Sequence, residues 1–194
     1  KHTMTIRQDV YESTTSFVGL AERINAAQNI LVTTHRKPDG DAIGSVVGLC
    51  RGLRSIGKDV TNLFIGPIEH GLRLAAGDCE MNVLDEVGLP EEEPDLIIVA
   101  DTGAWTQLEA LEKWLRARKE KVIGLDHHTN GDDVASDRIV DVTAAACTQV
   151  VMELFEEMCV SLGTGRNSVA EALFIGLGTD TGWFRFSNAD ARCF

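Results

Sequence analysis

Short apolar runs alternate with segments of helical period along this chain, and this alternation restricts the fold more than any other feature. The apolar runs have the composition of buried strands and cover 29–35, 59–65, 94–101 and 121–128. The segments of helical period cover 17–28, 42–56, the charged stretch 106–120, 144–158, and a last one that starts at the capping-box signature SVAE (168–171) and runs through Gly178. This pattern is typical of a parallel sheet whose strands are connected by helices. We therefore predict an α/β fold built on a parallel sheet.

The composition excludes several classes of protein. A chain of 194 residues that is 44% hydrophobic can bury a sizeable core, and its net charge of −12 argues against nonspecific binding of long nucleic acid, which relies on a basic surface. The cysteines are odd in number and form no C-x-x-C pair, which favours reduced thiols and a cytoplasmic location. No run reaches the roughly 18 apolar residues of a membrane span, and the polar first residues lack the apolar core of a signal peptide. We expect neither a membrane nor a long nucleic acid as partner.

Polar residues stand at the carboxyl ends of three of the predicted strands. One strand ends at His35, another at Asp101, and a third at Asp126, which His127 and His128 follow. In an open parallel sheet, ligands bind in the crevice outside the carboxyl ends of the strands. These side chains should therefore converge in space.

Each of these residues also has an ordinary structural explanation. A single Asp after a strand is more often a turn or helix-capping residue, and Asp41 stands where it would cap the helix over 42–56. Several carboxylates in one crevice, however, repel one another unless a cation compensates them. A mixed set of carboxylates and imidazoles suits Mn²⁺, and two metal ions roughly 3.5–4 Å apart form the usual clamp for in-line attack on phosphorus.

Four short motifs, taken together, resemble the signatures of the DHH phosphoesterase superfamily in order and spacing. They are His35-x-x-x-Asp39-x-Asp41, the strand-end Asp101, the triplet Asp126-His127-His128, and Asp180 in GTDTG. The resemblance covers 17–194. The stretches HRKPDGDAIGS, DHHTN and GTDTGWFRFSN are most similar to the branch of nanoRNases and pAp phosphatases, while family II inorganic pyrophosphatases share the triplet but fit GTDTG and its following aromatic residue less well.

The resemblance implies a three-layer domain over 16–194 with helices on both faces of the sheet, after an N-terminal extension over 1–15. It also implies two Mn²⁺ ions, which Mg²⁺ or Co²⁺ could replace. The ligand sets that it implies are His35 and Asp39 for the first ion, Asp41, His127 and Asp180 for the second, and Asp101 as the bridge between them.

Further roles follow from the same resemblance. Asp126 would orient a histidine by a hydrogen bond, as metal-bound imidazoles usually require, and His128 would contact the scissile phosphate. Ser45 and Arg185 are weaker candidates for contacts with a substrate phosphate. Gly40 and Gly44 would let the backbone approach the site closely.

The activity implied is that of a Mn²⁺-dependent phosphoesterase that hydrolyses short oligoribonucleotides or 3′-phosphoadenosine 5′-phosphate by two-metal activation of water. Members of this branch usually continue into a smaller C-terminal domain that grips the nucleotide. Since the chain ends soon after the fourth motif, we expect that domain to lie outside it and turnover by this chain alone to be weak. Two alternatives remain, a cyclic-dinucleotide phosphodiesterase of the same superfamily and a non-catalytic module that senses metal or nucleotide, and the oligomeric state is open, a homo-oligomer included.

Overall fold

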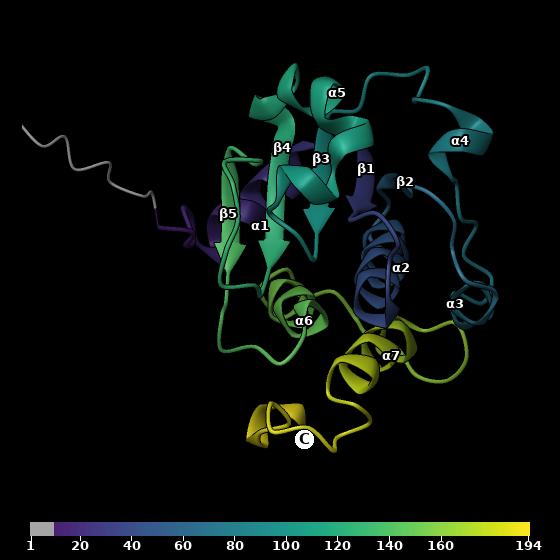
Figure 1. Cartoon of the computed structure of the whole chain (residues 1–194), viewed down its shortest axis with the longest axis vertical. Coiled ribbons are helices and arrows are strands. Elements are labelled where there is room, and N and C mark those ends of the chain that lie inside the picture. Colours follow the sequence, from purple (N-terminus) through teal and green to yellow (C-terminus); the bar gives the residue numbers. More distant parts are fainter. Residues whose placement is uncertain (1–9) are drawn as a thin grey trace, which may run out of the picture.

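A five-stranded, entirely parallel sheet forms the centre of the computed structural model, which describes residues 10–194 (Figure 1). The predicted α/β fold with a parallel sheet is confirmed. Its strands, in the spatial order β2-β1-β3-β4-β5, are β1 (Asn29–Thr34), β2 (Asp59–Leu63), β3 (Leu96–Ala100), β4 (Val122–Asp126) and β5 (Asp137–Val140). Residues 1–9 of the expected extension over 1–15 lie outside the described residues.

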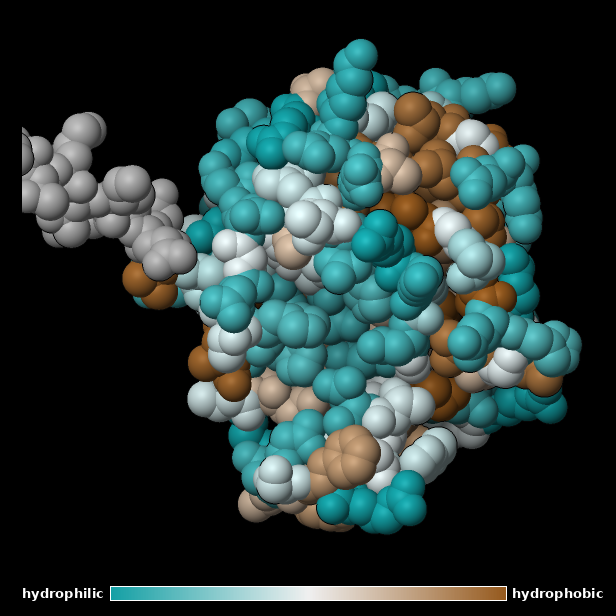
Figure 2. Space-filling model, in the orientation of Figure 1, coloured by the Kyte–Doolittle hydropathy of each residue, from teal (hydrophilic) through white to brown (hydrophobic). Residues whose placement is uncertain are grey.

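Helices cover both faces of the sheet, as the resemblance implied. They are α1 (Phe17–Ala26), α2 (Gly40–Ser55), α3 (His70–Ala75), α4 (Leu84–Val87), α5 (Glu112–Arg116), α6 (Cys147–Glu157) and α7 (Val169–Asp180), with short 3-10 helices η1 (Trp105–Gln107), η2 (Glu109–Leu111), η3 (Lys119–Lys121) and η4 (Ala191–Cys193). The strand arrowheads, which mark the carboxyl ends, are directed towards α6 and α7 (Figure 1). On the side of the molecule seen in Figures 1 and 2, the middle region, where the strands end, is mostly hydrophilic (Figure 2). Within residues 10–194, no helix has the length and apolar character needed to cross a membrane.

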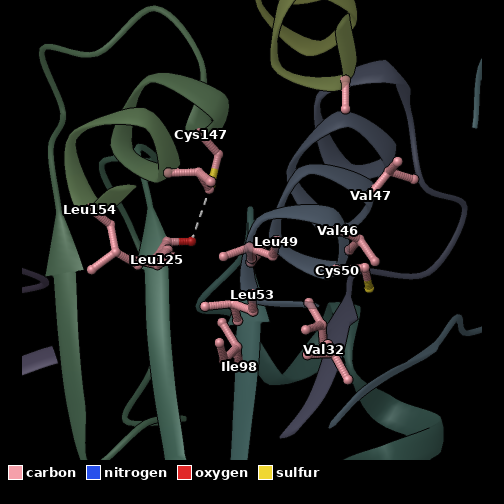
Figure 3. Packing of buried hydrophobic residues seen from close by; sticks show 14 of the residues in the cluster. Val32, Val46, Val47, Leu49, Cys50, Leu53, Ile98, Leu125, Cys147 and Leu154 are labelled. Atoms are coloured by element: carbon pink, nitrogen blue, oxygen red, sulfur yellow. Dashed lines mark hydrogen bonds between the residues drawn. The ribbon is translucent and has the colours of Figure 1, made fainter. Parts of the chain in front are cut away.

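The central strands β1, β3 and β4 are mostly apolar because both faces of the sheet are buried there. Alternate residues of β1 enter opposite cores: Ile30 and Val32 pack with α1, α2 and α6, whereas Leu31 packs with the leucines of η2 and α5. In the core that contains Ile30 and Val32, α2 and α6 lie next to each other over the sheet (Figure 3). The thiol of Cys147 on α6 donates a hydrogen bond to the carbonyl of Leu125 on β4, with Sγ and O 3.2 Å apart, which ties the start of α6 to the sheet.

The single charged helix predicted over 106–120 is wrong. The segment is instead broken into η1, η2, α5 and η3. One side of the segment is buried, because Leu108, Leu111 and Leu115 are packed against the sheet, whereas charged residues such as Lys113 and Arg116 are exposed. Its first turn is fixed by tertiary structure, since the backbone N–H of Trp105 donates to the carboxylate of Asp132. The three leucines keep the helical spacing of three and four residues, but the backbone that carries them is divided among short 3-10 and α-helical turns.

Glycines let α2 and α7 pack with their backbones in near contact. A Cβ placed on Gly44 would lie 2.5 Å from the carbonyl oxygen of Ala172 and 2.9 Å from the backbone nitrogen of Gly176, both on α7. Gly40, one turn earlier in α2, faces the side chain of Thr179 near the end of α7. The prediction that Gly40 and Gly44 admit backbone to the site therefore needs correction, because their missing side chains make room for a neighbouring helix.

Replacing Gly44 with Ala should destabilise the fold. The added methyl group meets backbone atoms of α7, which cannot move as a flexible side chain would, and overpacking of this kind lowers the free energy of unfolding by about 1–3 kcal/mol. Urea unfolding measures the change. Gly71→Ala is the matched control: a Cβ at Gly71 in α3 meets nothing within 4 Å, so stability should stay the same or rise. Equal stability of Gly44→Ala and the unchanged protein would contradict the close backbone contact between Gly44 and α7.

Candidate metal centre

Three neighbouring strands bring their terminal polar residues together at the middle of the sheet edge. His35 and Asp101 follow β1 and β3 directly, and His127 follows β4. The Nε2 atom of His35 lies 3.4 Å from Oδ2 of Asp101, and Nε2 of His127 lies 3.5 Å from Oδ1 of the same carboxylate. Because β1, β3 and β4 are adjacent, the chain places Asp101 between two imidazoles that are 92 positions apart in sequence (127 − 35).

The start of α2 adds two carboxylates, and their structural roles differ from those expected. Asp39, rather than Asp41, caps the helix: its Oδ1 accepts hydrogen bonds from the backbone N–H groups of Asp41 and Ala42, both at 3.0 Å. Asp41 lies inside the first turn. Its prediction as the cap is therefore wrong, because the helix begins two residues earlier than the apolar period indicates.

Asp41 is a buried carboxylate held by the start of another helix. Its side chain is 1% exposed, and it accepts hydrogen bonds from the backbone N–H groups of Cys147 and Thr148, at 2.6 and 3.1 Å, where α6 begins. The unpaired N–H groups and partial positive charge of a helix N-terminus stabilise an anion in this position. Oδ2 of Asp41 also lies 3.7 Å from Nε2 of His127.

Asp180, the last residue of α7, completes the cluster. Its Oδ2 lies 3.6 Å from Nε2 of His127. Three groups of side chains place their donor atoms within 4.8 Å of one another: His35 with Asp39 and Asp101, Asp41 with His127 and Asp180, and Asp101 with His127 and His128. The first two contain the same residues that the resemblance assigned to two metal ions, and Asp101 lies between them.

Asp101 has the features of a residue fixed for a cation. Its φ of 62° lies in the left-handed region, which few residues other than glycine adopt and which Asp and Asn tolerate best. Its side chain is 3% exposed, and Oδ1 has no hydrogen-bond partner among the described residues. A buried carboxylate oxygen without a partner is unfavourable, and a bound cation would satisfy it. The residues present therefore fit a divalent metal.

The charges of the cluster are compensated by protons when no metal is bound. Burial opposes protonation of His35 and His127, but the nearby carboxylate of Asp101 and the other surrounding carboxylates outweigh it and raise the pKa of each to about 9. Burial, followed by the charges of Asp101 and Asp180, raises the pKa of Asp41 to about 8. Metal ions bind the deprotonated forms, so binding must release these protons.

The ring of His128, rather than that of His127, is held by Asp126. Oδ1 of Asp126 lies 2.7 Å from Nδ1 of His128 and also accepts hydrogen bonds from the backbone N–H groups of His127 and His128, at 2.8 and 3.2 Å. Asp126 is 1% exposed, whereas the His128 side chain is 54% exposed and lines the cavity. With Nδ1 engaged, Nε2 remains available to a ligand.

The cluster forms the floor of an open cavity of about 260 Å³. The lining residues that our sequence reasoning missed are Thr102, Gly103 and Ala104 in the loop after β3, and Gln107 at the end of η1. Their position directly after a central strand is the signal that could have found them, since such loops border the crevice of a parallel sheet. The hydrophilic middle of the face in Figure 2 agrees with this polar lining.

Two weaker candidates do not lie at the cavity. Ser45 is fully buried within α2, so the predicted contact between its hydroxyl and a phosphate is wrong. Arg185 is absent from the lining, and its Nε donates a hydrogen bond to the carbonyl of Gly182 at 2.8 Å.

Comparison with known proteins agrees with this geometry. A family model described as the DHH family, N-terminal domain, matches residues 29–177. The chain is similar to proteins named bifunctional oligoribonuclease and PAP phosphatase NrnA from Thermus thermophilus (31% identity, covering 87% of this chain and 48% of that protein) and Bacillus subtilis (29%, covering 89% and 52%). It is also similar to a solved exopolyphosphatase-related protein from Bacteroides fragilis, with a TM-score of 0.79 and 25% identity, covering 91% of this chain and 52% of that one. The chain spans about half the length of the curated relatives it matches.

The metal-free protein should lose stability as the pH rises from about 6.5 to 9. The pKa values of His35, His127 and Asp41 are all raised above their ordinary values of 6.5, 6.5 and 3.8, so the folded state binds more protons than the unfolded state in this range. Their stabilising contribution is complete below the unfolded-state pKa and is lost as the pH passes the folded-state pKa. We therefore expect Tm to fall across this range in EDTA.

The same melting series with saturating Mn²⁺ should show a smaller fall, because deprotonated ligands bind the metal. His70→Gln is the matched control, since His70 is exposed on α3 and outside the cluster; it should keep the pH dependence of the unchanged protein. A Tm that rises with pH in EDTA would be inconsistent with the raised pKa values.

Proposed function

The chain belongs to the DHH family, whose N-terminal domain model it matches, and from this premise we propose that it is a metal-dependent phosphoesterase acting on short oligoribonucleotides or on 3′-phosphoadenosine 5′-phosphate. The observation that carries the proposal is the position of Asp101 between two groups of metal-type donors. The names of the relatives from Thermus thermophilus and Bacillus subtilis support this choice of substrates. Since the chain spans about half of their length, we also propose that this half of the protein takes part in binding the substrate.

Two Mn²⁺ ions are the proposed cofactors. His35 and Asp39 would hold one, Asp41, His127 and Asp180 the other, and Asp101 would contact both. Bound there, the ions would supply Lewis-acid stabilisation of the phosphate and activation of water. The carboxylates and neutral imidazoles are ligands that suit Mn²⁺, and Mg²⁺ or Co²⁺ are the alternatives to compare.

The chain's own groups position the reaction. The N-terminus of α6 fixes the carboxylate of Asp41, and the cap of α2 fixes that of Asp39. His128 presents Nε2 to the cavity because Asp126 holds its Nδ1, so we assign it the contact with the scissile phosphate. From this position it can stabilise the developing charge or donate a proton to the leaving oxygen. The Asp126 carboxylate raises the pKa of His128, which favours the protonated form that this role requires.

The cavity limits the size of the substrate. Its volume of about 260 Å³ is just below the roughly 300–1,000 Å³ of typical ligand pockets, so we assign it room for one terminal nucleotide. In the described part of the chain, no Lys or Arg lines it. Substrate phosphate would therefore be bound by the metal ions and histidines, and the acidic chain would have little affinity for long nucleic acid.

Asp101→Asn should abolish binding of one metal ion or both and lower activity by about 100-fold or more, as removal of one preorganised electrostatic group from an active site does. Asparagine is preferable to alanine here because it tolerates the positive φ of this position. Calorimetric titration with Mn²⁺ and hydrolysis of a dinucleotide measure the two effects. Asp133→Asn removes a carboxylate whose side chain is 71% exposed and is not part of the cavity lining, so it should leave both unchanged. Full activity of Asp101→Asn would exclude the bridging role.

Competition between substrates separates the candidate functions. Hydrolysis of a linear RNA dinucleotide and of 3′-phosphoadenosine 5′-phosphate should depend on Mn²⁺ and exceed hydrolysis of a cyclic dinucleotide. The Bacillus subtilis relative serves as a positive control for the assay. Preference for the cyclic dinucleotide would instead indicate a cyclic-dinucleotide phosphodiesterase. Nucleotide binding without product at any metal concentration would indicate a sensing module.

A further inference from the structure

The hydroxyl of Tyr11 reaches the candidate active site from the beginning of the described chain. It donates a hydrogen bond of 2.7 Å to Oδ2 of Asp126, a residue 115 positions away. Asp126 is the carboxylate whose other oxygen holds Nδ1 of His128. Tyr11, Asp126 and His128 therefore form a continuous hydrogen-bonded chain from the N-terminal segment to the cavity.

Each oxygen of Asp126 has a separate task. Oδ1 receives the backbone N–H groups of His127 and His128 together with the His128 ring, whereas Oδ2 receives the Tyr11 hydroxyl. Burial and the Asp126 carboxylate both raise the pKa of Tyr11, so its hydroxyl stays protonated and remains a donor. With both oxygens engaged, the carboxylate cannot rotate without breaking a buried hydrogen bond.

The ring of Tyr11 is also fitted into the site. It occupies the space that a side chain at Gly103 or Gly131 would require, since a Cβ on either glycine would collide with the tyrosine ring. Gly103 belongs to the loop that lines the cavity, and Gly131 follows the lining residue Asn130. The guanidinium of Arg138 also lies over the ring, 5.1 Å from its centre.

The segment that carries Tyr11 is fastened to the outer strand β5. The backbone N–H of Thr14 donates to the carbonyl of Arg138 at 2.9 Å, and the hydroxyl of Ser13 accepts from the N–H of Val140 at 2.8 Å. These contacts hold the segment without touching Asp126. They make Ser13 a suitable residue for testing the segment separately from the Tyr11 hydroxyl.

We propose that Tyr11 is a positioning residue, which acts through Asp126 to fix the orientation of His128 towards the substrate phosphate. The inference rests on the proposed function for its effect on catalysis. Its structural part stands alone, because the orientation of the His128 ring can be observed without turnover. Tyr11 itself contacts neither the metal donor groups nor, by this proposal, the substrate.

Tyr11→Phe is the decisive variant, since it removes the hydroxyl and keeps the ring between Gly103 and Gly131. Loss of such a supporting hydrogen bond should lower kcat by about 10-fold. KM for a dinucleotide and the affinity for Mn²⁺ should stay unchanged, because Tyr11 contacts no donor group. Ser13→Ala is the matched control and should retain full kcat, although it also removes one hydroxyl from the same segment.

Nitrogen NMR of the histidine rings gives a readout that does not depend on activity. With the His128 signals assigned from a His128→Gln spectrum, Tyr11→Phe should shift them and leave those of His35 in place. If Ser13→Ala changed the His128 signals as much as Tyr11→Phe does, the proposal would be overturned. The change would then come from loosening of the N-terminal segment and not from loss of the Tyr11 hydroxyl. Unchanged His128 signals and unchanged kcat in Tyr11→Phe would overturn it as well.

A double mutant tests whether Tyr11 acts through His128. In a His128→Gln background, Tyr11→Phe should cause no further loss of kcat, since residues of one chain of contacts are not additive. A further loss of about 10-fold would show an independent role and overturn the proposal. If the unchanged protein hydrolyses none of the substrates, the proposed function fails, while the NMR comparison still decides the role of Tyr11.

Discussion

The close packing of α2 against α7 is the contact on which the rest of the site depends. These helices run in opposite directions, since Gly40 at the start of α2 meets Thr179 near the end of α7, and Gly44 meets Ala172 and Gly176. The N-terminus of one helix and the C-terminus of the other therefore open onto the same cavity. This contact brings Asp180, at the end of α7, into one group of donor atoms with Asp41 and His127.

This arrangement concentrates negative charge, and the fold offsets it with fixed dipoles and histidines. Asp41 receives two N–H groups from α6, and the raised pKa values of His35 and His127 show that protons take up part of the remaining charge when metal is absent. Asp101 keeps one buried oxygen without a partner among the described residues. The fold thus maintains a site that is electrostatically incomplete on its own, which is the condition for strong binding of a divalent cation.

The sequence predicts the sheet edge well and the helix contacts poorly, for physical reasons. Strand-end residues such as His35 and Asp101 can be found because parallel strands end at one edge whatever the details of packing. Whether Asp39 or Asp41 caps α2 depends on the helix start, which the apolar period does not fix. Gly44 carries no local signal for a partner helix, and Tyr11 meets Asp126 across 115 positions with no pattern at either end. The leucines of 106–120 show the same limit, because their burial is decided by the sheet that they cover.

The charge distribution also links metal to substrate. In the described chain, the cavity lining contains carboxylates, histidines and neutral groups but no Lys or Arg, so in the metal-free cavity a phosphate would meet Asp39, Asp101 and Asp180 with only protonated histidines to offset their charge. Bound divalent cations would add positive charge at this place. By linkage, a substrate phosphate must then raise the affinity for metal by the same factor by which metal raises the affinity for phosphate. A site built in this way would select a phosphate substrate through bound metal ions, while the hydrogen bonds of Asp41, Asp126 and His128 would fix the orientation of the side chains.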